Sequence, residues 1–122
     1  MTGRPVRGMI LEVDLEPVLG REQGRSRPCV VVQNNAGNRF SSTTIVVPLT
    51  DAVHLAAPSP VYVLVKKGDG GIRKDSIALA DQIRAVDFER VRRSFGVLSP
   101  ESMKAVDRAL LIGLGLSRPG KS

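Results

Sequence analysis

The chain has 122 residues and a formal net charge of +6, which suits one small domain with a single core. Its composition is 42% hydrophobic and 25% charged, as in a globular protein, and the excess of Lys and Arg over Asp and Glu favours a polyanionic partner. A single His and a single Cys exclude a two-histidine ribonuclease site and the usual zinc site, which needs about four ligands. No metal or cofactor is therefore expected.

The cysteine content and the amino terminus predict the compartment. One Cys allows no internal disulfide, which fits a reducing cytoplasm. Residues 1–7 have no apolar core and do not resemble a signal peptide. The longest apolar tract, 109–116, is interrupted by glycine and is much shorter than the roughly 20 residues of a membrane helix. We expect a cytoplasmic protein that does not associate with membranes.

The first two thirds of the chain predict short β-strands. Residues 9–15 alternate as in a strand with one buried face, and Pro17 ends the pattern. A charged loop at 17–28 precedes the apolar run 29–33, which predicts a central strand. Further strands are expected at 43–49, 61–65 and 76–83, with turns at 34–38 and 68–71.

The last third of the chain predicts helices. Asp87 is a candidate cap for a short helix to about Ser94, on which Arg90, Arg92 and Arg93 would form a solvated face. Ser99 followed by Pro100 predicts the start of an amphipathic helix. We therefore predict a mainly β fold with a C-terminal helix, a small antiparallel barrel, formed by a single domain at 1–116 with a disordered tail at 117–122.

The loop at 20–28 is the main candidate for function, because the usual catalytic motifs are absent. It places three Arg, one Glu and one Gln between glycines, and the turn at 34–39 adds amides and another cation. A solvated surface loop is the alternative interpretation. His54 is interpreted as a surface residue, Cys29 as a small core residue, and the glycines at 68–71 as a hairpin turn.

Several ordered segments resemble the MazF/PemK toxins, the ribonuclease components of type II toxin–antitoxin pairs. They are Gly20-Arg-Glu-Gln-Gly24, Arg27-Pro28, Val30-Val-Val-Gln-Asn34, Asn38-Arg-Phe40, Ile45-Val-Val-Pro-Leu-Thr50 and Asp75-Ser-Ile-Ala-Leu-Ala-Asp-Gln-Ile-Arg84. The resemblance covers about residues 7 to 116. It implies an SH3-like barrel of the CcdB/PemK type that forms a homodimer. It also implies metal-independent cleavage of single-stranded RNA by attack of a 2′-hydroxyl on the adjacent phosphate.

The resemblance also implies roles for particular residues. The catalytic Arg and Thr of the family fall on Arg27 and Thr50, and the family residues close to RNA fall on Glu22, Gln23 and Gln82. Glu22 is the only carboxylate in the loop, so it is a candidate general base, with an ion pair to a neighbouring Arg as the alternative. Candidate RNA contacts are Gln23, Arg25, Asn38, Arg39 and Gln82.

The implied partners are single-stranded RNA and a MazE-like antitoxin with an acidic, disordered tail that folds on binding. Two other functions compete with this hypothesis. One is a barrel that binds RNA or protein without catalysis. The other is a gyrase poison of the CcdB type, in which a C-terminal Trp contacts the target, whereas this chain has no Trp.

Overall fold

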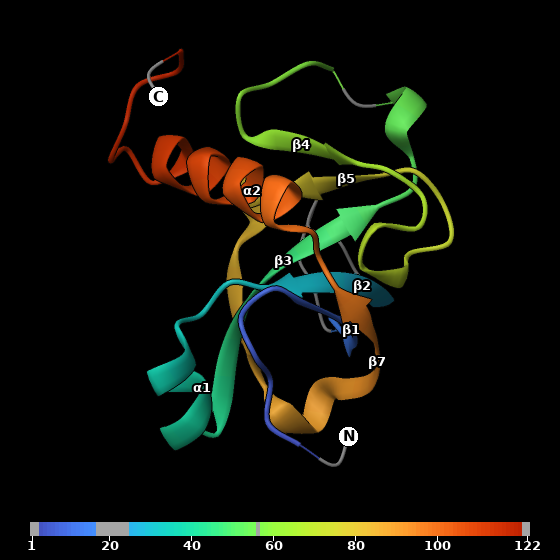
Figure 1. The fold of residues 1–122 in the computed structure, drawn as a ribbon, viewed down its shortest axis with the longest axis vertical. Coiled ribbons are helices and arrows are strands. Elements are labelled where there is room, and N and C mark those ends of the chain that lie inside the picture. The colour runs from blue at the N-terminus through green and yellow to red at the C-terminus, as the bar shows by residue number, and fades with distance from the viewer. Residues whose placement is uncertain (1–2, 17–24, 56, 121–122) are drawn as a thin grey trace.

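A computed structural model describes residues 3–16, 25–55 and 57–120, and Figure 1 shows their arrangement. The predictions for Glu22 and Gln23 lie outside the described residues. The strands are β1 (Met9–Asp14), β2 (Ser26–Val31), β3 (Thr43–Thr50), β4 (Tyr62–Val65), β5 (Ser76–Leu79), β6 (Arg84–Asp87) and β7 (Val91–Val97), and the helices are α1 (Asn35–Phe40) and α2 (Pro100–Gly113).

All recorded strand pairs are antiparallel, in the order β4-β5-β3-β2-β1-β7, with β6 also paired to β3. Strand β3 changes its partner along its length. Residues 43–46 pair with β6, whereas Leu49 and Thr50 pair with β5. The strand predicted at 76–83 is correct in its first half, which forms β5, but it is too long. A 3₁₀ turn at Ala80–Gln82 ends β5, and the chain then continues into β6, which pairs with the other end of β3.

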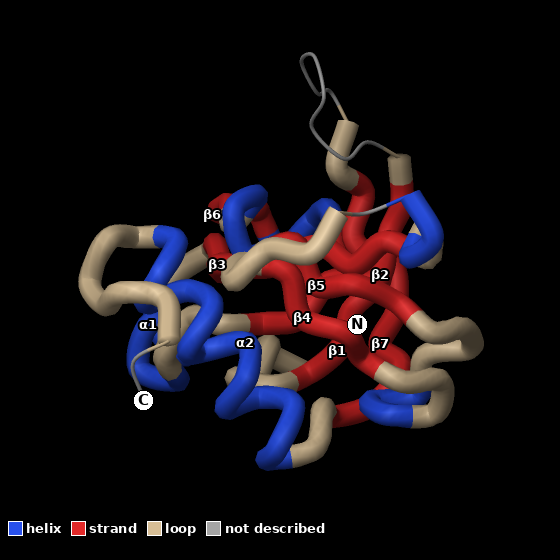
Figure 2. Tube along the Cα trace, turned by 90° about the horizontal axis from the view of Figure 1, so that it is seen from above, coloured by secondary structure: helices blue, strands red, loops and turns tan. Residues whose placement is uncertain are grey.

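The sheet buries side chains on both of its faces. One cluster includes Ile10, Val30 and Val47, and helix α2 covers it with Val106 and Leu110. The other lies on the opposite face and includes Leu11, Val13, Cys29, Val31 and Val46. The one-sided burial predicted for residues 9–15 is thus incomplete, since the curled sheet also encloses Ile10. Figure 2 shows α2 beside the strands.

The predicted start of helix α2 is confirmed. Ser99 caps it by accepting a hydrogen bond from the Ser102 amide, and Pro100 occupies its first turn. Asp69, in the 3₁₀ turn Asp69–Gly71, accepts hydrogen bonds from the Ser99 amide (2.8 Å) and Ser99 Oγ (2.9 Å). The turn predicted at 68–71 therefore also anchors the C-terminal helix.

The short helix predicted at 87–94 is wrong. Asp87 does cap a turn, since it accepts a hydrogen bond from the Glu89 amide at 2.9 Å. That turn is a single 3₁₀ turn at Phe88–Arg90, after which Val91–Val97 forms strand β7 against β1. Long-range pairing with β1 thus determines the structure of this segment.

Residues 34–38, predicted as a turn, form the cap and first part of α1. The predicted fold class is confirmed, because the structure is an antiparallel sheet with a C-terminal helix. In the described part of the chain, no helix has the length and apolar character needed to cross a membrane.

Candidate active site

Arg27, the predicted catalytic arginine, lies in strand β2 and not in the loop that the sequence predicts. Its backbone pairs with Val13, so the β1–β2 ladder fixes the position of its side chain. Its Nε is buried and has no hydrogen-bond partner among the described residues. Because burying an unpaired donor is costly, this nitrogen is suited to bind a ligand oxygen.

Thr50 is the last residue of β3, and it lies near Arg27 in the register of the sheet. Cys29 of β2 pairs with Pro48 of β3. If this antiparallel register is continued by two residues, Arg27 lies opposite Thr50. Side chains two residues apart share a face of a strand, so Arg27 and Thr50 point to the same side. Thr50 Oγ1 accepts a hydrogen bond from the Ala52 amide at 3.2 Å. Its hydroxyl hydrogen is left to donate.

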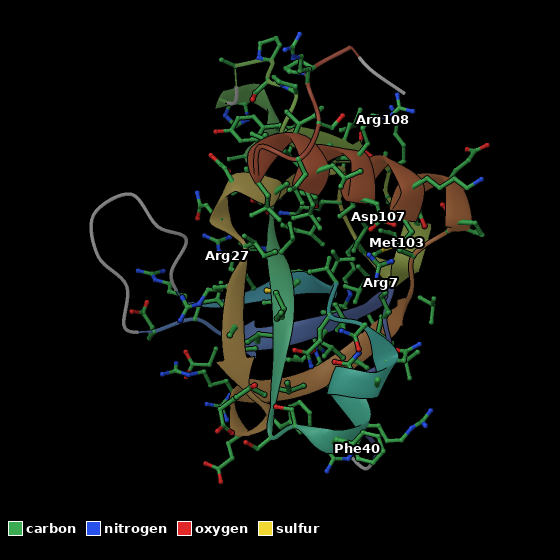
Figure 3. The ribbon with its side chains drawn as sticks, turned by 90° about the vertical axis from the view of Figure 1, so that its left-hand side faces the viewer. Arg7, Arg27, Phe40, Met103, Asp107 and Arg108 are labelled. Carbon is green, nitrogen blue, oxygen red and sulfur yellow. The ribbon has the colours of Figure 1, made fainter. Side chains whose placement is uncertain are left out.

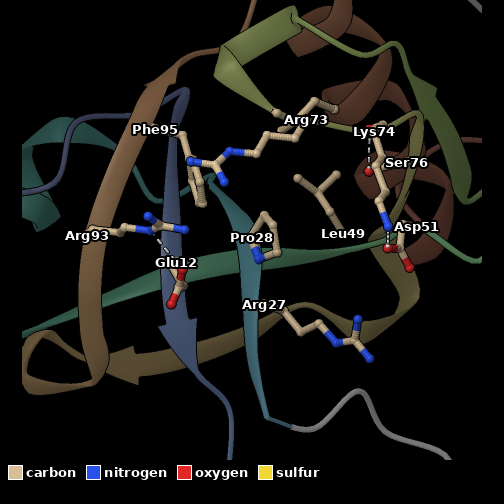
Figure 4. Close-up of a pocket in the computed structure, with 11 residues that line it drawn as sticks. Glu12, Arg27, Pro28, Leu49, Asp51, Arg73, Lys74, Ser76, Arg93 and Phe95 are labelled. Carbon is tan, nitrogen blue, oxygen red and sulfur yellow. Dashed lines mark hydrogen bonds and ion pairs between the residues drawn. The ribbon is translucent and has the colours of Figure 1, made fainter.

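A cavity of about 240 Å³ opens beside Arg27 (Figure 4). Its apolar lining consists of Pro28, Leu49, Ile72 and Phe95. Its cationic lining consists of Arg27, Arg73, Lys74 and Arg93, which outnumber the two carboxylates of Glu12 and Asp51. Ser76 completes the lining. The cavity therefore combines apolar surface with an excess of positive charge.

The two carboxylates pair with only two of the four cationic side chains. Glu12 Oε1 accepts from Arg93 Nε at 2.9 Å, and Asp51 lies 3.6 Å from Lys74 Nζ. Neither Arg27 nor Arg73 makes an ion pair within the described residues. Two guanidinium groups thus remain to bind an anion, and guanidinium matches the geometry of phosphate.

Close backbone packing places the segment that carries Arg73 against β7. Gly70 has a φ of +65°, and a Cβ at this position would lie 2.6 Å from Ile10 Cγ1. Gly96 of β7 is equally restricted, since its Cβ would lie 2.9 Å from the Gly70 carbonyl oxygen. These two glycines allow the connection between β4 and β5 to form one wall of the cavity.

Arginines from β6, from the 3₁₀ turn Phe88–Arg90 and from β7 bind the end of β1 next to this site. Arg84 Nη1 donates to the Leu15 carbonyl (3.1 Å), and Arg90 Nη1 donates to the carbonyls of Asp14 (3.2 Å) and Glu16. Arg92 pairs with the Asp14 carboxylate at 3.1 Å. The helix predicted to carry Arg90, Arg92 and Arg93 is wrong, because these residues lie in a 3₁₀ turn and in β7 and contact β1, although Arg92 and Arg93 are exposed as predicted.

The Asp14 carboxylate is stabilised in its charged form by this arrangement. A hydrogen bond from the Glu16 amide, at 3.1 Å, and the bond from Arg92 lower the pKa of Asp14 below its usual value of 3.8.

Burial raises the pKa of the Cys29 thiol to about 12. Cys29 is therefore a protonated core residue, as the sequence predicts, and not a nucleophile.

Two of the predicted RNA contacts lie away from this cavity. Asn38 and Arg39 belong to α1, which precedes the start of β3, whereas the cavity lies at the end of β3. Figure 3 shows the distance between Arg27 and Phe40, the last residue of α1. The structure does not bring α1 and Arg27 together.

The side chain of Asn38 has a structural role in place of the predicted RNA contact. It is 1% exposed, and its Oδ1 accepts hydrogen bonds from Thr44 Oγ1 (2.6 Å) and Gln33 Nε2 (3.0 Å). Its Nδ2 donates to the Gln33 carbonyl at 3.0 Å. Arg39 is exposed and lies over the Phe40 ring at 5.9 Å.

Arg25 and Gln82 lie on other elements. Arg25 is exposed, has a φ of 61°, and its amide donates to Glu16 Oε1 at 2.7 Å. Gln82 ends the 3₁₀ turn between β5 and β6 and already has an interaction within the chain. The predictions for these two residues remain predictions.

Comparison with known proteins identifies the family. A family model described as the PemK-like, MazF-like toxin of type II toxin-antitoxin system matches residues 6–114. The chain belongs to this family. The resemblance inferred from the ordered segments of the sequence is thereby confirmed.

Relatives of the MazF/PemK family match nearly the whole chain. An endoribonuclease MazF from Staphylococcus epidermidis is 42% identical over 111 residues, which cover 91% of this chain and 92% of the relative. A mycobacterial endoribonuclease, solved with its cognate antitoxin, is 26% identical with a TM-score of 0.76, covering 94% and 99% of the two chains. A MazE–MazF structure from Deinococcus radiodurans is 25% identical with a TM-score of 0.73, covering 94% and 99%.

The cavity of this MazF/PemK protein has no signature in the sequence. Glu12, Arg73, Arg93 and Phe95 line it, yet they come from separate strands and a turn. The basic character of residues 66–74 was the one signal available, and it could not show which strand the segment contacts.

Proposed function

We propose that this MazF/PemK toxin is a sequence-specific endoribonuclease that cleaves single-stranded RNA at the site formed by Arg27 and Thr50. The observation that carries the proposal is the partly buried Arg27 guanidinium. It has an unpaired Nε, lies at the edge of a cationic cavity, and is on the same face of the sheet as Thr50. The endoribonuclease activity of the Staphylococcus relative supports this assignment.

The proposed reaction requires stabilisation of negative charge. The 2′-oxygen attacks the adjacent phosphorus, the bond from phosphorus to the 5′-oxygen breaks, and a 2′,3′-cyclic phosphate and a 5′-hydroxyl result. Arg27 stabilises the pentacovalent intermediate through charge-assisted hydrogen bonds, and Thr50 donates its hydroxyl to a phosphate oxygen. Hydrolysis of the cyclic product gives a 3′-phosphate.

Two proton transfers complete the reaction. The 2′-hydroxyl loses a proton and the leaving 5′-oxygen gains one. Because an arginine side chain stays protonated in proteins, Arg27 is assigned to stabilisation of the transition state. Glu22 remains the proposed base, and Gln23, Arg25, Arg39 and Gln82 remain proposed RNA contacts. None of these steps needs a metal ion.

The proposed partners follow from charge and from the relatives. The net charge of +6 suits both RNA and the acidic tail of a MazE-like antitoxin. The mycobacterial and Deinococcus relatives were solved with their antitoxins. We also propose a homodimer, with the cytoplasm as the location because its RNA substrate is found there.

The proposal is tested by incubating the purified protein with mixed-sequence RNA in EDTA and mapping the new ends. We expect 5′-hydroxyl ends at one short motif. Arg27→Ala and Thr50→Ala should each lower the rate by roughly 10²-fold or more. Arg108→Ala removes an exposed arginine from α2 and should cleave at the wild-type rate.

Three outcomes would contradict the proposal. One is intact RNA, another is binding without cleavage, and the third is full activity in a correctly folded Arg27→Ala protein. Circular dichroism of each variant separates lost chemistry from lost structure. Stabilisation of a gyrase–DNA cleavage complex, in place of RNA cleavage, would support the CcdB-type alternative.

A further inference from the structure

We propose that the cavity lined by Pro28, Leu49, Arg73 and Phe95 is a nucleotide-binding subsite that holds the base next to the cleaved phosphate. The inference rests on the proposed function, because it takes Arg27 as the residue that binds this phosphate. Arg27 lines the same cavity. Thr50 does not line it, because the side chains of Arg27 and Thr50 alternate along β2 and β3 with those of Pro28 and Leu49. The phosphate would therefore lie at the rim, and a base in the cavity would belong to a nucleotide beside the bond that breaks.

The size and the apolar surface of the cavity fit one base. Its volume of about 240 Å³ is below the roughly 300–1,000 Å³ typical of sites for drug-sized ligands. Leu49 and Ile72 belong to the main core cluster and are only 1% and 5% exposed, so they form a firm floor. Phe95 adds to this lining an aromatic ring, the kind of group on which proteins stack unstacked RNA bases.

Phe95 and Arg93 supply a prearranged stacking surface. The Arg93 guanidinium lies over the Phe95 ring, 4.8 Å from its centroid. Glu12 holds this guanidinium through the bond to Arg93 Nε, and β1 pairs Glu12 directly with Arg93. Aromatic rings and guanidinium planes are the groups on which proteins stack single-stranded bases. Since both are already fixed, little conformational entropy is lost on binding.

Arg73 supplies positive charge on the opposite wall of the cavity. It is exposed and makes no ion pair or hydrogen bond within the part of the chain that the structure describes. The glycine contacts between Gly70 and β7 hold its segment in place. Figure 4 shows Arg73 extending over the cavity near Phe95, with Pro28 and Leu49 below. Arg73 can therefore contact the phosphate or the edge of the bound nucleotide.

Charge and position favour RNA as the occupant. The cationic groups of the cavity outnumber its carboxylates by four to two, and one of them is Arg27. An acidic peptide would also be attracted by this charge. However, the stacking pair of Phe95 and Arg93 beside a candidate phosphate-binding arginine matches the alternation of base and phosphate in a nucleic acid strand.

The variants Phe95→Leu and Arg73→Ala test the subsite. Leu keeps apolar volume at position 95 but removes the aromatic face. Phe88→Leu is the matched control, because Arg4 lies over the Phe88 ring at 5.3 Å in a similar cation–π pair and neither residue lines the cavity. Arg108→Ala is the control for Arg73→Ala. Denaturation by urea shows whether each variant is folded.

We expect Phe95→Leu and Arg73→Ala to raise KM for RNA about tenfold, with a much smaller change in kcat. End mapping on a randomised RNA pool should also show a weaker preference at one nucleotide position beside the cut. The two controls should retain the wild-type KM and motif. An unchanged KM and motif in both folded cavity variants would overturn the proposal.

A binding measurement separates this proposal from the proposed catalysis. The probe is a fluorescent RNA of the cleaved sequence, or of mixed sequence if no cleavage occurs, with a 2′-deoxy nucleotide at the cut. Weaker binding by Phe95→Leu supports the subsite even if the wild-type protein fails to cleave RNA. Unchanged RNA binding, combined with weaker binding of a poly-glutamate peptide, would assign the cavity to an acidic protein partner and overturn the proposal.

Discussion

Arg84 donates a hydrogen bond from Nη1 to the carbonyl oxygen of Leu15, 3.1 Å away, and so joins β6 to the end of β1. Arg90 binds the neighbouring carbonyls of Asp14 and Glu16. This end of β1 pairs with the part of β2 that carries Arg27, since Val13 lies opposite Arg27. We therefore expect Arg84 to help position Arg27 through the backbone of β1.

Replacing Arg84 with Met should impair both stability and catalysis. Loss of a charged donor to a half-buried carbonyl should lower the free energy of unfolding by about 1–2 kcal/mol in urea denaturation. Because Arg27 would be less well fixed, kcat should fall several-fold at unchanged KM. Arg84→Lys, which retains a cationic donor, should restore part of both. A full-activity Arg84→Met protein with wild-type stability would show that the hydrogen bond has no positioning role.

Arg27→Lys keeps the charge at the candidate catalytic position but removes the planar guanidinium. A lysine cannot make two parallel hydrogen bonds to a phosphate, so we expect kcat to fall about 10- to 100-fold with a smaller change in KM. Single-turnover cleavage of a short RNA measures this. Arg108→Lys is the control for the substitution itself. Wild-type kcat in Arg27→Lys would mean that charge alone suffices.

Asp69 predicts a dependence of stability on pH. Burial raises its pKa, but hydrogen bonds from Ser102 Oγ and from the Ser99 amide and hydroxyl outweigh this, so the pKa lies below the usual 3.8. The charged carboxylate therefore stabilises the fold above about pH 4, and this contribution disappears as the pH falls through the folded-state pKa.

Asp69→Asn should lower the free energy of unfolding by about 1–2 kcal/mol at pH 7. The difference from the wild type should shrink as the pH falls below about 4 and through the lower folded-state pKa. Urea denaturation across this range measures it. Glu101→Gln removes a charge from the same end of α2 without changing Ser99 or Ser102, and it should show no such convergence. A difference that stays constant with pH would refute this explanation.

Cys29 should react with thiol reagents only when the protein opens. With a pKa of about 12, about one thiol in 10⁴ is ionised at pH 8, and the side chain is 0% exposed. The labelling rate with a chromogenic disulfide should rise with urea in parallel with unfolding. Rapid stoichiometric labelling in native buffer would show that Cys29 is accessible.

The elements that local patterns determine were predicted well. The strand predicted from the alternation at 9–15 and the Ser99-Pro100 start of α2 agree with the structure, because strand periodicity and capping depend on neighbouring residues. Strand β7 was predicted as a helix, since the cap at Asp87 is local whereas the pairing of Val91–Val97 with β1 is not. Sequence patterns also do not show that the Asn38 side chain is buried, where its amide satisfies its hydrogen bonds within the chain.

The sequence by itself determined the family, the antiparallel fold with its C-terminal helix, and the candidates Arg27 and Thr50, because these depend on motifs and periodicity along the chain. Only the tertiary structure decided that the cationic cavity exists. Phe95, Arg73 and Arg27 meet there because β1 pairs with both β2 and β7 and because Gly70 packs against Ile10. Such contacts between distant segments leave no periodic signal in the sequence. The cationic side chains of the cavity are therefore brought together only when the chain folds.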